Sequence, residues 1–303
     1  MRWLEWVCVC IVSLYIVVRL RHRAGQSARD LLVHFVWLAA TSALGEDSMI
    51  RLHGFYDYAP GWSLPLDRVP LLIVLIWPIV IDSASRLSVG LCHALGRPPQ
   101  TRNVAAVTAA VVFVDAWLIE PIATTSGLWR WHAPGLFSVP PIGVFGWAVF
   151  AGWVVWLQPR LGAPGQPFGR RLLRMGIASA TAIVGTHAVL IASWWGLLRW
   201  LSQPLPAQAG IVTAWLLLLP LALGFWRARV GRFVPRADLL VRLPAAAFFF
   251  VLLAVRHAEI GAQQTALLTY ALAFALPYWV LLLVRAAPES LGQSSARTKQ
   301  ASR

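Results

Sequence analysis

Residues Val104–Thr124 read VAAVTAAVVFVDAWLIEPIAT. A transmembrane helix needs about 20 mostly apolar residues, and this stretch has that length. Asp115 and Glu120 are its two ionisable residues. Because the bilayer interior gives exposed strand edges no hydrogen-bond partner, the stretch predicts a membrane-spanning helix.

Similar apolar runs lie on both sides of this one. They are Leu4–Val18, Leu31–Gly45, Val69–Leu91, Phe137–Leu157, Met175–Leu198, Ile211–Trp226, Leu239–Val255 and Thr265–Val284. Hydrophobic residues make up 58% of the 303-residue chain and charged residues 13%, whereas a soluble domain carries about 25% charged residues. We therefore expect an all-α, polytopic integral membrane helix bundle with about nine transmembrane helices.

The positions of the 26 basic residues indicate how these helices are oriented. Eighteen of them fall in alternate loops and at the C-terminus, and six fall on the opposite side. Cytoplasmic loops carry the excess of Lys and Arg, so the N-terminus is expected outside the cell (inner) membrane and the C-terminus in the cytoplasm. The same rule explains the net charge of +14 without nucleic-acid binding. Residues 1–285 are expected to form a single transmembrane domain, followed by a disordered cytoplasmic tail over residues 286–303.

The sequence gives no sign of a metal, nucleotide or flavin site. Its three cysteines and seven histidines do not cluster at the spacings that bind metals. No glycine-rich dinucleotide or phosphate-binding pattern follows a strand. We therefore expect chemistry without a cofactor.

Residues 43–147 contain one pattern twice. An acid is followed by two aromatic residues flanking a charged one, then by Val-Pro, then by Trp seven residues after the Pro. The first copy has Glu46, Tyr56-Asp57-Tyr58, Val69-Pro70 and Trp77, and the second has Glu120, Trp129-Arg130-Trp131, Val139-Pro140 and Trp147. Each copy predicts a helix, an outer loop and a second helix. Internal duplication is common in membrane folds and often puts the working site at the repeat interface.

Three acids in these copies are candidate catalytic residues: Glu46, Glu120 and Asp115. Each lies in or at the end of an apolar run. A charged side chain at the bilayer centre costs about 2.5–3.5 kcal/mol on insertion scales, so acids in such places usually serve a function. Burial favours the neutral carboxyl, which can act as a general acid. The alternative is that Glu46 and Glu120 cap helices at the aqueous boundary.

The aromatic residues next to these acids are candidate substrate-binding residues. Many of the 17 Trp fit an ordinary interfacial belt. Aromatic faces also attract cations, by about 0.5–2 kcal/mol each, and could steady a carbocation formed from an apolar substrate. The opposite charges of Asp57 and Arg130 suggest a pair between the two loops. The candidates are Tyr56, Asp57, Tyr58, Trp77, Trp129, Arg130, Trp131 and Trp147.

The two copies resemble the two signatures of a membrane carotenoid-biosynthesis family. The first resemblance lies in Gly45-Glu46, His53-Gly54-Phe55-Tyr56-Asp57-Tyr58, Val69-Pro70-Leu71 and Trp77. The second lies in Asp115, Glu120-Pro121, Gly127-Leu128-Trp129-Arg130-Trp131, Val139-Pro140-Pro141 and Phe145-Gly146-Trp147. The likeness covers roughly residues 30–160. The family includes bisanhydrobacterioruberin hydratase and the γ-carotene 1′,2′-hydratases.

This resemblance implies a cofactor-independent hydratase, a lyase that adds water to the terminal double bond of an acyclic carotenoid end. Glu46 or Glu120 would protonate the alkene, and a water oriented by the other acid or by Asp115 would add to the cation. The implied partners are a lipophilic carotenoid and membrane lipid, and the oligomeric state stays open. The chain departs from the family in having Gly143 near a position that is usually Asn, and Asp47-Ser48-Met49-Ile50-Arg51 in place of a glycine-rich stretch.

Two alternatives remain at this point. Small membrane carotenoid cyclases have a similar architecture and also begin by protonating an alkene. Some of them carry paired acids after the Pro motif, which Val139-Pro140-Pro141-Ile142-Gly143 lacks. The chain could instead be a non-catalytic transporter or a pigment- or lipid-binding membrane protein, since several apolar runs contain prolines that suit broken transporter helices.

Overall fold

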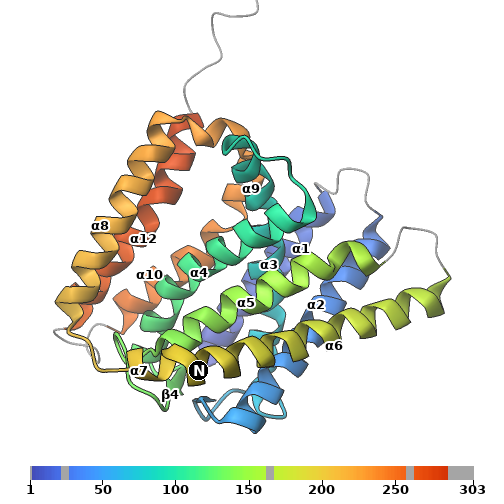
Figure 1. The fold of residues 1–303 in the computed structure, drawn as a ribbon, viewed down its shortest axis with the longest axis horizontal. Coiled ribbons are helices and arrows are strands. Elements are labelled where there is room, and N and C mark those ends of the chain that lie inside the picture. The colour runs from blue at the N-terminus through green and yellow to red at the C-terminus, as the bar shows by residue number, and fades with distance from the viewer. Residues whose placement is uncertain (1, 22–26, 162–166, 257–262, 286–303) are drawn as a thin grey trace, which may run out of the picture.

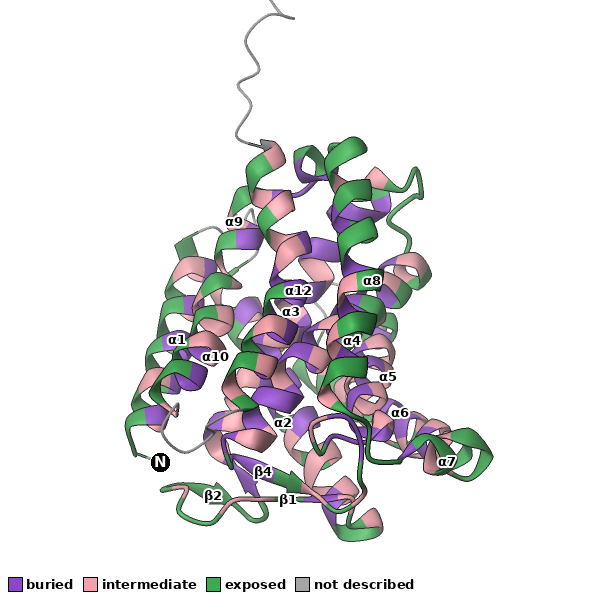
Figure 2. Cartoon of the chain, turned by 90° about the vertical axis from the view of Figure 1, so that its left-hand side faces the viewer, coloured by how far each residue is buried: buried purple, intermediate pink, exposed green. Residues whose placement is uncertain are grey.

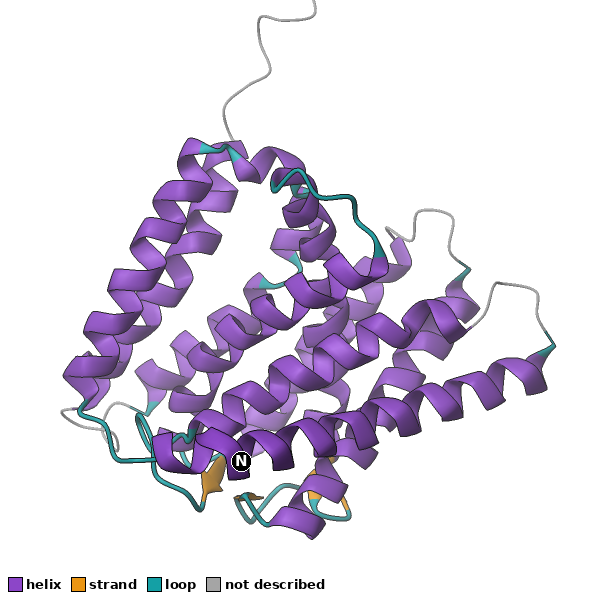
Figure 3. Cartoon of the chain, viewed as in Figure 1, coloured by secondary structure: helices purple, strands orange, loops and turns teal. Residues whose placement is uncertain are grey.

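The computed structural model describes residues 2–21, 27–161, 167–256 and 263–285. The tail predicted over residues 286–303 lies outside this range. Within it, the chain forms a helical bundle with short strands at one end (Figures 1 and 3). The elements are α1 (Arg2–Arg21), α2 (Ala28–His53), β1 (Tyr56–Tyr58), β2 (Pro65–Leu66), β3 (Val69–Pro70), α3 (Leu71–Ala94), α4 (Thr101–Thr125), β4 (Trp129–Trp131), α5 (Pro141–Leu157), η1 (Gln158–Leu161), α6 (Phe168–Ser193), η2 (Trp194–Leu198), α7 (Arg199–Leu201), α8 (Ala207–Arg227), η3 (Val230–Phe233), α9 (Arg236–Leu240), α10 (Leu243–Val255) and α12 (Gln263–Arg285).

Each of the nine predicted apolar runs overlaps one or more of these helices. Seven helical segments of the described chain are long and apolar enough to cross a membrane: α1, α3, α4, Phe168–Leu201, α8, Arg236–Val255 and Gln263–Val284. Helix α5 is apolar but has only 17 residues, and α2 is long but does not meet the apolar criterion. The chain is thus a multi-pass helical membrane protein, with seven of the nine expected spans supported by length and composition.

The outer faces of the bundle are apolar. Leu216 and Leu217 on α8 and Val184 on α6 are more than 60% exposed. Figure 2 shows such exposed surface along α8 and on the end of α6 and α7. A soluble monomer rarely exposes apolar surface on this scale, whereas a bilayer covers it.

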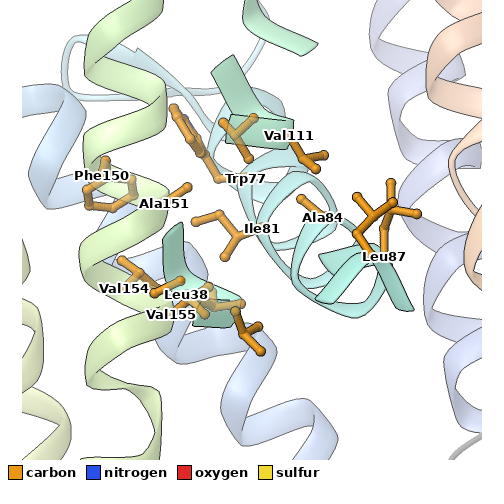
Figure 4. Packing of buried hydrophobic residues seen from close by; sticks show 14 of the residues in the cluster. Leu38, Trp77, Ile81, Ala84, Leu87, Val111, Phe150, Ala151, Val154 and Val155 are labelled. Atoms are coloured by element: carbon orange, nitrogen blue, oxygen red, sulfur yellow. The ribbon is translucent and has the colours of Figure 1, made fainter. Parts of the chain in front are cut away.

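The core lies where α2, α3, α4 and α5 pack together. Leu38 of α2, Ile81 and Ala84 of α3, and Ala151 and Val154 of α5 belong to one buried cluster (Figure 4). Helices α8 and α12 form a second pair that packs beside α4. The central four helices therefore form the rigid frame on which the strand-bearing loops are held.

The boundaries of the helices follow from local signals. Pro70 and Pro140 stand in extended conformation immediately before α3 and α5, where the ring fixes φ and the missing N–H is not needed. Gly54 ends α2 with a left-handed φ of 57°. The predicted end of the second apolar run at Gly45 is wrong, because the helix continues to His53. Glu46 consequently lies inside α2 and not at its end.

The two outer loops meet in a short antiparallel ladder at one end of the bundle. Strand β1 pairs with β4, with Asp57 opposite Arg130 at the centre. Tyr56 lies opposite Trp131, and Tyr58 lies opposite Trp129. The two helix–loop–helix segments are therefore joined by equivalent residues of their loops.

Candidate functional site

An apolar cavity of about 140 Å³ lies inside the bundle, against the strand-bearing loops. Residues of α1 to α6, of β1 and β4, and of α10 line it. The described acids in this lining are Glu46 and Glu120. The two predicted catalytic glutamates thus face one cavity, which is otherwise surrounded mainly by aliphatic and aromatic side chains.

Glu46 is held by three aromatic donors. The Tyr58 hydroxyl donates to its Oε2 at 2.8 Å, and the Trp77 indole Nε1 donates to its Oε1 at 2.8 Å. The Tyr56 hydroxyl also donates to Oε2. Glu46 is half-buried as a residue, and it borders the cavity.

Glu120 is held by tryptophans. The indole Nε1 atoms of Trp129 and Trp131 each donate to its Oε2 at 2.7 Å. Trp147 also lines the cavity. Glu120 is 1% exposed, so its indole partners and the surrounding side chains cover it.

The two acid clusters touch each other through their aromatic rings. The ring centroids of Trp77 and Trp147 are 4.5 Å apart, and those of Tyr56 and Trp131 are 4.7 Å apart. Each contact joins one residue of the first copy to one of the second. The equivalent acids, loops and tryptophans therefore surround a single site at the interface of the copies.

Both phenols beside Glu46 stay protonated. Burial raises the pKa of Tyr56 and of Tyr58 well above the usual value for tyrosine, and the neighbouring negative charge of Glu46 acts in the same direction. A neutral phenol can donate one hydrogen bond and also accept one. Tyr56 and Tyr58 can therefore pair with Glu46 whether it is ionised or protonated.

Gly143 makes room for one of the tryptophans. A Cβ at this position would lie 2.5 Å from Cζ2 of Trp131, closer than side-chain carbons approach. Trp131 in turn donates to Glu120. The glycine that departs from the expected Asn is thus the residue that lets the indole reach the carboxylate.

Three of the candidate residues lie away from the cavity. Asp115 accepts hydrogen bonds from Arg242, the residue before α10, and from the Tyr278 hydroxyl, the latter at 2.6 Å. Its carboxylate is committed to this ion pair and does not belong to the described cavity lining. Asp57 and Arg130 are opposite each other in the ladder but also lie outside the lining.

The expected pair between Asp57 and Arg130 is not formed as predicted. Asp57 Oδ2 lies 2.8 Å from Nε2 of His132, two residues beyond Arg130. His132 Nδ1 lies 2.6 Å from the Gly54 carbonyl oxygen. The side chains of paired residues in an antiparallel ladder point to the same face. The Asp57 carboxylate nevertheless pairs with the imidazole of His132, which is shorter than the Arg130 side chain and has a hydrogen-bond partner at both nitrogens.

The sequence interpretation missed a histidine contact at the cavity wall. His187 of α6 lines the cavity, and its Nδ1 lies 2.9 Å from Nε2 of His53. Its Nε2 lies 2.9 Å from the Ser48 hydroxyl. Since 134 residues separate the two histidines, no local spacing reveals their contact. In the part of the chain that the structure describes, no group of three or more potential ligands could hold a metal ion.

Fold and site together define a multi-pass helical membrane protein that holds two acids against one apolar cavity. Residues 6–217, more than two thirds of the chain, match the family model of carotenoid biosynthesis proteins. The chain belongs to that family. The match includes both acid clusters and α6 but stops before α9, α10 and α12. Neither a curated protein nor a solved structure gives a significant match.

Proposed function

We propose that this carotenoid biosynthesis protein is a hydratase that adds water to the terminal double bond of an acyclic carotenoid end. The observation that carries the proposal is the pair of glutamates, each held by aromatic donors, around one apolar cavity. Protonating an unactivated alkene requires a positioned acid and an environment that tolerates a carbocation. This cavity offers both.

Glu46 is the better proton donor of the two acids. It borders the cavity with a partly exposed side chain, and its phenol partners accommodate either protonation state. Indole N–H groups can only donate, so the partners of Glu120 favour its carboxylate form. We assign Glu46 as the general acid and Glu120 as the fixed negative charge that stabilises the cation.

The aromatic rings complete the site for a cation. Tyr56, Tyr58, Trp129 and Trp131 line the cavity next to the acids. Protonation at one alkene carbon leaves a tertiary cation at the other, and aromatic faces attract such charge by about 0.5–2 kcal/mol each. Water then adds to the cation, which gives a tertiary alcohol.

The size of the cavity suggests how a long polyene binds. A volume of about 140 Å³ is close to the roughly 150 Å³ of an apolar cavity that holds benzene. It therefore fits one end group, and the remaining chain must lie between helices or in the bilayer. Helices α1 and α10 line the cavity on one side, and α6 lines it on the other. A bound end group would therefore lie between two layers of helices.

A carotenoid cyclase is the competing activity. It would use the same protonation, but a second double bond of the substrate would capture the cation instead of water. The mainly apolar lining suits such an internal capture. The two reactions differ in product mass, because hydration adds one water and cyclisation adds nothing.

The test is expression in a lycopene-accumulating bacterial host followed by liquid chromatography and mass spectrometry. We expect a pigment heavier by one water, reduced about 10²–10⁴-fold in Glu46→Gln, the usual range for loss of a general acid. Asp47→Asn is the matched control, since this neighbouring acid pairs with Arg51 at 2.6 Å outside the cavity lining. An isobaric product with a shortened chromophore would instead establish a cyclase. Unchanged carotenoids, with acyclic C50 and monocyclic substrates also tested, would support a transporter or pigment-binding protein.

A further inference from the structure

Three polar side chains link the cavity wall to the strand-bearing end of the bundle. His187 borders the cavity, and His53 lies in the last turn of α2 beside exposed Leu52. The ring nitrogens Nδ1 of His187 and Nε2 of His53 are 2.9 Å apart, and Ser48 Oγ is 2.9 Å from His187 Nε2. These three side chains therefore form a hydrogen-bonded path from the acid site toward water.

His187 differs from the other polar residues in the described cavity lining. The hydroxyls of Ser42 and Thr186 each donate to a backbone carbonyl in their own helix. The two glutamates are occupied by aromatic donors. A neutral imidazole has a nitrogen that can accept a proton, which the hydroxyl and indole groups of the lining do not offer. His187 is thus the candidate base of the cavity.

Ser48 can release His187 without losing its own hydrogen bond. Its hydroxyl also lies 3.0 Å from the Gly45 carbonyl oxygen, to which it donates. A water that takes the place of Ser48 at His187 Nε2 therefore leaves no unpaired hydroxyl behind. Gly45 and Glu46 are consecutive on α2 and both line the cavity, so that water would stand on the same wall as the proposed acid.

His53 is well placed to receive a proton from His187. It lies at the C-terminus of α2, where the helix dipole stabilises positive charge. Its ring stacks on Phe55 with centroids 5.3 Å apart, which fixes its orientation toward His187. The second copy has Gly127 at the place that corresponds to His53, counted from each acid. The proton path through His187 and His53 thus serves the Glu46 side of the site alone.

We propose that His187, supported by Ser48 and His53, binds the water that adds to the carotenoid cation and takes up its proton. The proposal rests on the proposed hydratase function. Glu46 gives a proton to one alkene carbon, the π bond breaks, and the water oxygen forms a bond to the cationic carbon. In the reacting state His187 carries its proton on Nδ1, which faces His53 Nε2, and its Nε2 accepts from the water. The water's excess proton passes to Nε2 as the Nδ1 proton moves to His53 and on to solvent, while a solvent proton reloads Glu46. The sum is alkene plus water giving alcohol, with both residues returned to their starting state.

The experiment follows hydration and protonation separately. Membranes that contain the native chain or His187→Phe are incubated with an acyclic carotenoid in D₂O. Mass spectrometry then measures the hydrated product and the deuterium in the recovered carotenoid. Without a bound water the cation can lose a proton and return to an alkene, which leaves deuterium in the recovered carotenoid. His34→Phe is the matched control, because His34 of α2 is a half-buried helical histidine like His187 but lies outside this cavity.

For His187→Phe we expect about 100-fold less hydrated product with deuterium still entering the recovered carotenoid. His53→Phe should lower the product in the same direction, and His34→Phe should leave it unchanged. The proposal is overturned if His187→Phe hydrates like the native chain, or if product and deuterium fall together in both His187→Phe and His187→Gln. A native chain that neither hydrates nor exchanges deuterium would refute the hydratase function itself, which separates the two failures.

Discussion

The partners of the two glutamates differ in one chemical respect, on which the roles proposed for them rest. Glu46 is bound by phenols and one indole, whereas Glu120 is bound by indoles. Phenols both donate and accept hydrogen bonds, and indoles only donate. Two acids in equivalent positions can therefore hold different protonation states in one cavity.

Removing one phenol should weaken the acid without removing it. In Tyr58→Phe, Glu46 keeps Tyr56 and Trp77 but loses the 2.8 Å bond from Tyr58. A hydrogen bond to a charged group contributes about 1.5–3 kcal/mol, so we expect product formation to fall about 10- to 100-fold. Product yield per amount of membrane protein measures this. Tyr270→Phe is the control, since Tyr270 is buried against Phe137 and Phe274 outside the cavity lining, and an equal loss there would contradict the assignment.

Gly143→Ala should disturb the site through Trp131. The added methyl would lie 2.5 Å from the indole, which must move and give up its 2.7 Å bond to Glu120. We expect lower hydration and a loss of stability of about 1–3 kcal/mol, the usual cost of overpacking. Product yield and the thermal unfolding midpoint in detergent would be measured together. Gly176→Ala has open space around its Cβ and should change neither.

At the scale of elements, α10 and α12 are tied to α4 by a buried ion pair. Arg242, immediately before α10, contacts Asp115 of α4, and Tyr278 of α12 donates to the same carboxylate. The Asp115 and Arg242 side chains are 10% and 13% exposed. Asp115, an acid inside the apolar stretch Val104–Thr124, thus has an ion-pair partner and lies outside the cavity lining.

Breaking this pair from one side should destabilise the protein more than removing it entirely. Arg242→Met leaves the Asp115 charge uncompensated, and such a change costs about 3–5 kcal/mol. The double variant Arg242→Met with Asp115→Leu should recover much of that loss, because no buried charge remains. Thermal unfolding in detergent compares the two. A double variant as unstable as the single one would show that the pair stabilises the protein by more than neutralising a buried charge.

At the scale of the whole molecule, the strands and the N-terminal end of α1 lie at one end of the bundle and the C-terminal end of α12 lies at the other (Figures 1 and 2). This arrangement is compatible with termini on opposite sides of a membrane. The excess of arginine in alternate loops predicts that the C-terminal side is cytoplasmic.

Reporter fusions test this orientation. A fluorescent protein fused after Arg303 should be folded in the cytoplasm, and alkaline phosphatase inserted between β1 and β2 should be active outside. The opposite pattern would contradict the charge argument. It would also place the acid cavity at the cytoplasmic end of the bundle.

How much of this could be predicted from the sequence depends on the separation of the residues in the chain. The apolar runs and the matched pattern are visible in the sequence. Of the residues at equivalent places, Glu46 and Glu120 line one cavity, and Trp77 contacts Trp147. Two features depend on tertiary packing between distant segments: the pairing of the three-residue strands and the contact of His53 with His187. The spacing of residues in the sequence therefore does not predict them. The partner of Asp115 was equally hidden, since Arg242 lies 127 residues further on.

The ladder of β1 and β4 has a consequence for the origin of the protein. Antiparallel pairing of equivalent residues about a central position is the contact that a two-fold axis creates between identical subunits. We infer an ancestor that carried one helix–loop–helix unit and worked as a homodimer, with the same glutamate on both sides of its axis. A fusion of the two genes would then have allowed each half to change independently. Tyrosines came to surround one acid, and tryptophans the other. A chain divided between α3 and α4 and expressed as two pieces should then reassemble in the membrane, as its ancestor's subunits did.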